Sequence, residues 1–380
     1  MRDFGPLYPL LLTRSHRVLT SISSWRSGSQ LAGNIPILSG TITYDDTANL
    51  RRRVEITVPY EDPQNQFVWD PGDDSAHPLN YYGQRLNVRV GIGLPRGGSV
   101  WFNHGWFLID SWEIEETDRT VSVSAVDLSQ LVDDDRHYTA ESPGKGFTYP
   151  QEFQRLLDGQ LPFVIDGGLS TRRVNSTTVW DRDRRKNLDD LCKAWPSRWY
   201  VDDDGDAHVA AAYEQITSDT PVDAVLDWGD EGTVTGRSRS GDRERIYNAV
   251  IVTGKQAEDG SEIQPFGGAE IRDVTSPIRI QGPFGKRPKF YQSDLLTTSA
   301  QCVATAETML TEASRIARTE PITAVPDYAL ELGDVAQVRT HGRYFTGRVQ
   351  SIELPLTADD GAMKVTLSTI PNDDDEEEGE

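Results

Sequence analysis

The stretch Gly105-Trp-Phe-Leu-Ile-Asp-Ser-Trp-Glu113 has a faint counterpart at Tyr344-Phe-Thr-Gly-Arg-Val-Gln-Ser-Ile-Glu353. Each copy ends on serine, an apolar residue and glutamate, and an alternating apolar run follows each after an acidic turn. These runs are Val121, Val123, Ala125 in the first copy and Met363, Val365, Leu367 in the second. A repeated β-unit indicates duplication, although two unrelated amphipathic hairpins would give the same pattern. Three duplicated chains in a ring would present six similar surfaces, which would let a trimer sit on a sixfold object.

The region around the first copy is predicted to be β-structure. Apolar and polar residues alternate over 54–58 and over 86–92, which is the period of half-buried strands. Turn-forming residues separate such runs at Asp70-Pro-Gly72 and at Pro95-Arg-Gly-Gly98. The sequence therefore predicts a first β-barrel over 15–144, preceded by an N-terminal extension over 1–14.

A small α+β domain is predicted next, inserted over 145–221. Tyr149-Pro150 opens a helix, because proline sacrifices no hydrogen bond in the first turn. A second helix ends before Pro196 and has apolar residues at helical spacing. These are Leu188, Leu191, Cys192 and Trp195. A hairpin with its turn at Asp204-Gly205 follows.

Strand patterns return after residue 222 and predict a second β-barrel over 222–372. This barrel includes a long helix over 298–318, whose start carries the capping pair Thr298 and Gln301. The segment 373–380 holds seven acidic residues and no apolar ones, so it is predicted to be a disordered acidic tail. The predicted fold is thus mainly β with an α+β insertion, and the two β-barrels are related.

Charge and cysteine content narrow the functional classes. The 380 residues include 38 basic and 60 acidic ones, a net charge of -22. Such a chain has no positive field for holding nucleic acid, but it could line a channel through which nucleic acid slides without sticking. Cys192 and Cys302 are predicted to be buried free thiols, as expected in a reducing cytoplasm. The early apolar run at 7–12 is too short to span a membrane.

Three further strings carry a family resemblance. They are Tyr247-Asn-Ala-Val-Ile-Val-Thr-Gly254, Gly282-Pro-Phe-Gly-Lys-Arg-Pro-Lys-Phe-Tyr291 and Leu330-Glu-Leu-Gly-Asp-Val335. Together with the long helix they resemble minor tail proteins of phages infecting actinobacteria. The order of barrel, α+β insertion and second barrel is similar to the tail hub proteins of tailed bacteriophages, called baseplate hub or tail-tip hub. The resemblance covers about 40 to 370.

The resemblance implies a structural virion protein and no enzyme. It implies a homotrimeric ring that joins the sixfold tail tube to the threefold tip or spike. Its partners would be the tail tube or distal tail ring and spike or fibre proteins, and genomic DNA would pass through its lumen without specific binding. The location would be the tail tip or baseplate, after synthesis in the host cytoplasm. Larger relatives carry a lysozyme-like or fibre domain where this chain has its acidic segment, which argues against cell-wall degradation.

A basic cluster in this acidic chain is the candidate interface. Lys286, Arg287 and Lys289 are followed by Phe290 and Tyr291, which offer apolar contact. We expect this segment to dock on a neighbouring subunit or another tail protein, with Arg287 paired to a carboxylate. A solvated surface loop is the alternative.

Patterns typical of enzymes and metal sites fail in detail. The run Asp202-Asp-Asp-Gly-Asp206 lacks the glycine and glutamate positions of a calcium loop, so a solvated turn is predicted. Gly285-Lys286 lacks the other residues of a phosphate loop. The six histidines do not have metal-ligand spacing. No catalytic residue, cofactor or metal is therefore predicted.

The tryptophans leave a second functional class open. The chain has nine, among them Trp25, Trp69, Trp101, Trp106 and Trp112. Their rings could stack on sugars in a carbohydrate-binding or cell-wall-acting tail-tip protein, or they could fill cores and subunit contacts. Size in solution separates the classes, because a hub must close into a ring whereas a sugar-binding module can remain a monomer.

Overall fold

A computed structural model gives the fold of the chain. It describes residues 2, 8–62, 64, 66–94, 97–169, 171–214, 216, 219–229, 232–238, 243, 246–254, 264–274, 276–293, 296, 298–313, 318–340 and 343–369. The acidic segment 373–380 lies outside them. The chain divides into two compact units, each treated by itself below. The first comprises Met1–Ser238 and Glu320–Leu367, and the second comprises Arg239–Thr319 and Ser368–Glu380.

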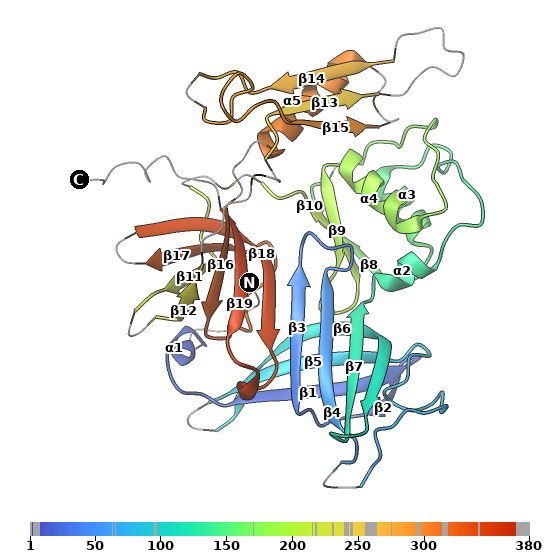
Figure 1. The fold of residues 1–380 in the computed structure, drawn as a ribbon. Helices are drawn as coiled ribbons and strands as arrows, with labels where there is room; N and C mark the ends of the chain where they lie inside the picture. Colours follow the sequence, from blue (N-terminus) through green and yellow to red (C-terminus); the bar gives the residue numbers. More distant parts are fainter. Residues whose placement is uncertain are drawn as a thin grey trace. The chain divides into compact units, whose positions relative to one another are not determined.

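In its described part, the first unit is dominated by one sheet of thirteen strands (Figure 1). The strands are β1 (Val18–Arg26), β2 (Ser29–Ala32), β3 (Ser39–Asp45), β4 (Arg52–Pro59), β5 (Arg85–Gly93), β6 (Ser99–Glu115), β7 (Thr120–Asp127), β11 (Ala224–Asp227), β12 (Val234–Arg237), β16 (Arg318–Ala324), β17 (Val335–Thr340), β18 (Arg343–Pro355) and β19 (Met363–Thr369). Their order is β12-β16-β19-β18-β3-β4-β7-β6-β5-β1-β2, and β17 pairs with both β11 and β18. The short helices α1 (Tyr8–Leu12) and η1 (Ala358–Asp360) belong to the same unit.

Strand β3 joins the two β-regions that were predicted to form separate barrels. On β3, Ile42 is opposite Val54 of β4 on one side and opposite Leu354 of β18 on the other. All three side chains are buried, and they belong to a single core that draws on both regions. The described strands thus form one continuous sheet. Local periodicity predicted the strands correctly, but it carries no information about the β3–β18 pairing, which spans some 300 residues of sequence.

The two copies of the repeated stretch occupy corresponding places in two hairpins. The first copy lies in β6, which pairs with the following strand β7, and the second lies in β18, which pairs with the following strand β19. Glu113 is opposite Ser122 in the first hairpin, and Glu353 forms an ion pair of 2.9 Å with Lys364 in the second. Both copies therefore begin a hairpin as expected, and their common origin stays a prediction.

The two helices and the hairpin predicted between the two β-regions are present, as α3 (Tyr149–Leu157), α4 (Arg184–Ala194), β9 (Ser197–Val201) and β10 (Ala207–Ala211). The structure adds α2 (Gln130–Asp134) and β8 (Phe163–Ile165), which the sequence analysis did not predict. Phe153 of α3 and Leu188 of α4 are fully buried in a second core. Gly205, with φ of +90°, makes the turn between β9 and β10, a conformation that glycine adopts without strain.

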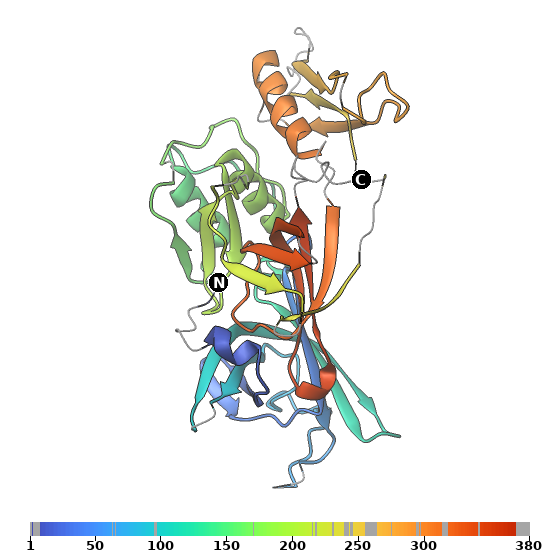
Figure 2. The same ribbon diagram turned by 90° about the vertical axis from the view of Figure 1, so that its left-hand side faces the viewer.

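The second unit is a small sheet covered by one helix. Its elements are β13 (Ala249–Thr253), β14 (Phe266–Glu270), β15 (Pro288–Gln292) and α5 (Ser299–Ala313), with strand order β14-β13-β15. Figure 2 shows α5 lying on one face of this sheet, where Cys302 is buried against Val252. The predicted cap is present: the amide of Gln301 donates to Thr298 Oγ1 at 3.3 Å, and the amide of Thr298 donates to Gln301 Oε1 at 3.1 Å. The sequence analysis predicted that this helix belongs to the second barrel, whereas in the structure it packs on β13 and β14.

Both cysteines are buried free thiols, as predicted. Cys192 lies on α4 and Cys302 on α5. None of the helices in the described residues combines the length and apolar character that crossing a bilayer requires.

Candidate functional site

The predicted interface residues lie on β15 and the loop before it. β15 is an edge strand of the small sheet and runs parallel to β13. The register places Phe290 beside Ile251, and Ile251 faces away from α5 because its neighbours Val250 and Val252 face the helix. Phe290 is 74% exposed, whereas Tyr291 packs against the core beneath α5. The segment therefore offers one large apolar side chain to the surface.

The basic side chains of this segment make contacts within the second unit. Lys286 Nζ lies 2.7 Å from Glu270 Oε1, and the hydrogen bond that it donates, with one from Arg272, lowers the pKa of Glu270. The charges of Arg287 and Lys289 lie over the ring of Tyr247, at 5.8 and 5.9 Å from its centre. Arg287 and Lys289 thus share one ring, whereas Lys286 pairs with a carboxylate of β14.

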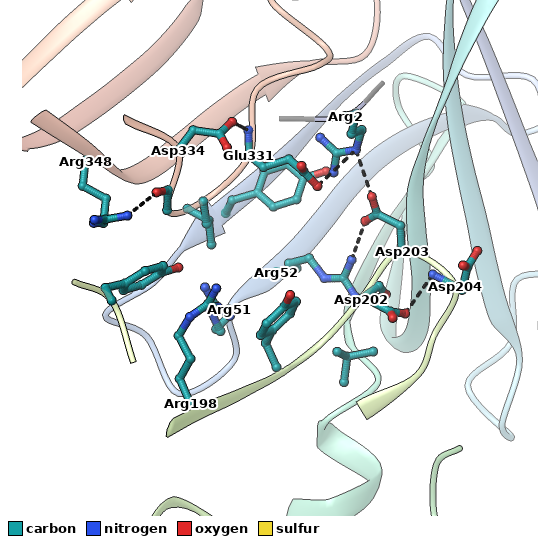
Figure 3. Close-up of a pocket in the computed structure, with 16 residues that line it drawn as sticks. Arg2, Arg51, Arg52, Arg198, Asp202, Asp203, Asp204, Glu331, Asp334 and Arg348 are labelled. Atoms are coloured by element: carbon teal, nitrogen blue, oxygen red, sulfur yellow. Dashed lines mark hydrogen bonds and ion pairs between the residues drawn. The ribbon is translucent and has the colours of Figure 1, made fainter. Parts of the chain in front are cut away.

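A buried ion network in the first unit was missed by the sequence analysis. Arg52 is 6% exposed, and it donates to Asp127 Oδ2, to Asp203 Oδ1 and to the carbonyl of Asp202, each at 2.9 Å. Burial alone would lower the pKa of Arg52, but the attraction of Asp127 and Asp203 outweighs it and raises the pKa. Figure 3 shows Asp203 between Arg52 and Arg2, whose Nε lies 2.9 Å from Asp203 Oδ2.

This network corrects the interpretation of the run at 202–206 as a solvated turn. Asp203 is 24% exposed and bonded to two arginines. It therefore ties the β9–β10 hairpin to the large sheet. Its arginine partners lie about 150 and 200 positions away in the sequence, so no local spacing could have predicted the contact.

A pocket of about 560 Å³ adjoins the network (Figure 3). Its lining carries five arginines and five carboxylates, which are Arg2, Arg51, Arg52, Arg198, Arg348, Asp202, Asp203, Asp204, Glu331 and Asp334. Three tyrosines complete the polar lining, which are Tyr44, Tyr200 and Tyr213. Burial raises the pKa of Asp334 to about 6. The pocket brings together the loop before β4, the β9–β10 hairpin and the strand β18.

The tryptophans of the first β-region are used mainly for packing. Trp69 is 4% exposed, and Trp25 packs edge-to-face on Trp106 with ring centres 5.8 Å apart. Trp101 is 38% exposed but lies directly against Gly91, where an added Cβ would approach its ring to 2.8 Å. Trp112 is partly buried and packs against the main core. These contacts are typical of tryptophans that pack cores.

Comparison with known proteins gives a clear result for the fold. The sequence matches no family model and no curated protein sequence. Its fold is similar to that of a tail protein from Neisseria meningitidis MC58, with a TM-score of 0.62, 13% identity, and coverage of 92% of this chain and 96% of that one. The 43 kDa tail protein of prophage MuSo2 from Shewanella oneidensis gives a TM-score of 0.60 at 13% identity, with coverage of 93% and 98%. Prophage tail protein gp18 from Listeria monocytogenes EGD-e gives 0.56 at 12% identity, with coverage of 92% and 94%. The chain has the fold of these phage tail proteins.

Proposed function

We propose that this chain is a structural component of a phage tail, a hub that assembles as a homotrimeric ring at the tail tip or baseplate. The observation that carries the proposal is the likeness to tail proteins over nearly the full length of both chains. A match of this extent concerns the whole arrangement of β-regions and the α+β insertion, and not one common domain. Fold alone does not fix function, so the proposal also rests on the features below.

The paired hairpins support the ring geometry. β6–β7 and β18–β19 begin with similar sequence and lie in one sheet, separated by β3 and β4. If each hairpin belongs to one of two related barrel-like halves, a ring of three chains offers six similar surfaces to a sixfold tube and three identical ones to a threefold spike. The ring would then adapt one symmetry to the other.

The charge of the chain supports a passage for DNA. A net charge of -22 would repel phosphates, so DNA could move through the lumen of such a ring without binding to its wall. The partners would be the tail tube or distal tail ring on one side and spike or fibre proteins on the other. The protein would be made in the host cytoplasm and become part of the virion.

The surface around β15 is the proposed docking site on a neighbouring subunit or another tail protein. Phe290 would supply the apolar anchor on one face of β15, and Lys286, Arg287 and Lys289 would supply positive charge nearby. An exposed aromatic side chain with charged groups nearby is typical of an interaction surface.

The test is the mass of the isolated protein and its place in the particle. Light scattering should give about 127 kDa for three chains of 42.4 kDa if the ring closes. Electron microscopy of the particle should then show a threefold ring below the tube. A chain that stays monomeric or dimeric in the particle would exclude the hub, and binding of cell-wall glycans by a monomer would favour the carbohydrate-binding alternative.

A further inference from the structure

Arginine and tyrosine side chains alternate along one side of the pocket in the first unit. Arg51 lies over the ring of Tyr200 at 5.0 Å, and Arg198 lies over the same ring at 4.7 Å. Arg198 also lies over Tyr213 at 4.0 Å, and Arg348 lies over Tyr213 at 4.6 Å. Stacking between two rings holds the Arg198 guanidinium in a fixed plane.

The side chains in this stack differ in whether their donor groups have hydrogen-bond acceptors. Arg348 donates to the carbonyls of Gly333 at 2.6 Å and Glu214 at 3.0 Å. Arg198 has no hydrogen bond or ion pair with the described residues, and its Nε is buried without an acceptor. The hydroxyl of Tyr213, which stacks on Arg198, is likewise buried without a partner. Buried donors without acceptors are costly, so this part of the pocket favours an incoming acceptor.

The charge of the lining limits what that acceptor can be. Arg2 and Arg52 are already neutralised by Asp203 and Asp127, and Arg51 is paired with Asp46. The five lining carboxylates would repel a phosphate or a nucleic acid, which carry more charge in a small volume. A single carboxylate matches the planar fork of one guanidinium and adds only one negative charge.

We propose that the pocket binds an aspartate or glutamate side chain of another polypeptide, held by Arg198 with support from Arg348 and Tyr213. These three side chains are each partly exposed, so the end of a carboxylate side chain can reach them from outside while the rest of its chain stays at the surface. Bound there, the carboxylate would link the β9–β10 hairpin to β18 and strengthen the contact that Asp203 makes from the other side of the pocket. The site does not depend on the ring proposed above, because it lies within one chain.

The test uses the full chain and a pair of blocked peptides, acetyl-(Gly-Glu)₄-amide and acetyl-(Gly-Gln)₄-amide, titrated by calorimetry at low salt. We expect the glutamate peptide to bind at least about tenfold more tightly than the glutamine peptide, because a charge-assisted bidentate contact is lost in the latter. Arg198→Gln should remove this preference. Arg198→Lys, which keeps the charge and loses the fork, and Tyr213→Phe should each reduce it, and these two carry the test if Arg198→Gln unfolds the protein.

The matched control is Arg119→Gln. Arg119 also stacks on a tyrosine, at 5.4 Å from the ring of Tyr60, but it lies outside the pocket, so its loss should leave binding unchanged. Equal binding of the two peptides, or equal loss in the Arg119 variant, overturns the proposal. If inorganic phosphate binds more tightly than the glutamate peptide, the ligand is not a carboxylate. If free glutarate binds as tightly as the glutamate peptide, the ligand need not belong to a polypeptide. If the chain is monomeric but still prefers the glutamate peptide, the proposed ring is refuted and the carboxylate site is supported.

Discussion

Arg52 is the residue on which three segments of the first unit converge, namely β4, the end of β7 and the β9–β10 hairpin. We predict that Arg52→Met destabilises this unit by about 3–5 kcal/mol, because the buried Asp127 would lose its arginine partner and Asp203 would lose one of its two. Urea unfolding followed by circular dichroism measures the change. Arg53→Met is the control: Arg53 is adjacent but exposed, and its loss should change stability by less than about 0.5 kcal/mol. Similar effects of the two substitutions would show that the network does not hold the segments together.

Asp334 predicts a pH dependence at the rim of the pocket. Its folded pKa of about 6 lies above the ordinary value of 3.8 because the carboxyl is buried. The folded state therefore holds the proton more tightly, and the resulting stability is complete below pH 4 and lost as the pH rises through 6. The unfolding free energy of the wild type should fall by about 1–3 kcal/mol relative to Asp334→Asn between pH 4 and pH 7. A constant difference over that range would contradict the prediction.

At the scale of single elements, the contact between β14 and α5 depends on a glycine. A Cβ on Gly267 would lie 2.3 Å from the amide nitrogen of Val303. The backbone of a packed helix cannot move away without disturbing its hydrogen bonds and its contacts with the sheet. We predict that Gly267→Ala destabilises the second unit by about 1–3 kcal/mol, as overpacking does in other cores. Hydrogen exchange of the β13 and β14 amides should report this as local loss of protection.

The neighbouring glycine provides the control for that experiment. A Cβ on Gly268 points to the other face of the sheet, where its nearest contact is the end of the Ile251 side chain at 3.3 Å. Gly268→Ala should therefore leave protection of the second unit nearly unchanged. If both variants lost protection equally, strand propensity and not helix packing would explain the effect.

At the scale of the whole molecule, the proposed assembly depends on the surface around β15. We predict that Phe290→Ser weakens association with the neighbouring subunit or tail protein by about tenfold or more, as expected for an aromatic anchor. Arg287→Glu should also impair particle assembly, because it reverses a charge at the rim. Sedimentation equilibrium and particle yield measure the two effects.

A second exposed side chain of the same unit tests whether position matters. Val274 is 76% exposed and Phe290 is 74% exposed, yet Val274 lies outside the predicted interface. Val274→Ser should assemble normally. Normal assembly of both Phe290→Ser and Arg287→Glu would show that this surface is a solvated one.

Much of the secondary structure could be predicted from short-range patterns. Alternation predicted β4 and β5, helical spacing and Pro196 predicted α4, and the pair Thr298 and Gln301 predicted the start of α5. These patterns are predictive because the strand period of two residues and the helix period of about 3.6 residues are visible within a short stretch of sequence. The candidate interface was predicted in the same way, since its basic and aromatic residues lie close together in the chain, and it stays a prediction.

Short-range patterns were enough to predict the strands, the helices and the buried thiols, because each depends on residues close together in the chain. Three features follow only from long-range contacts: β3 and β18 join the two β-regions into one sheet, α5 covers the separate sheet of β13–β15, and Arg198 stacks between Tyr200 and Tyr213 beside Arg348. Such contacts are selected by burial and charge pairing among segments far apart in sequence, and no local pattern encodes which distant segment will supply the partner.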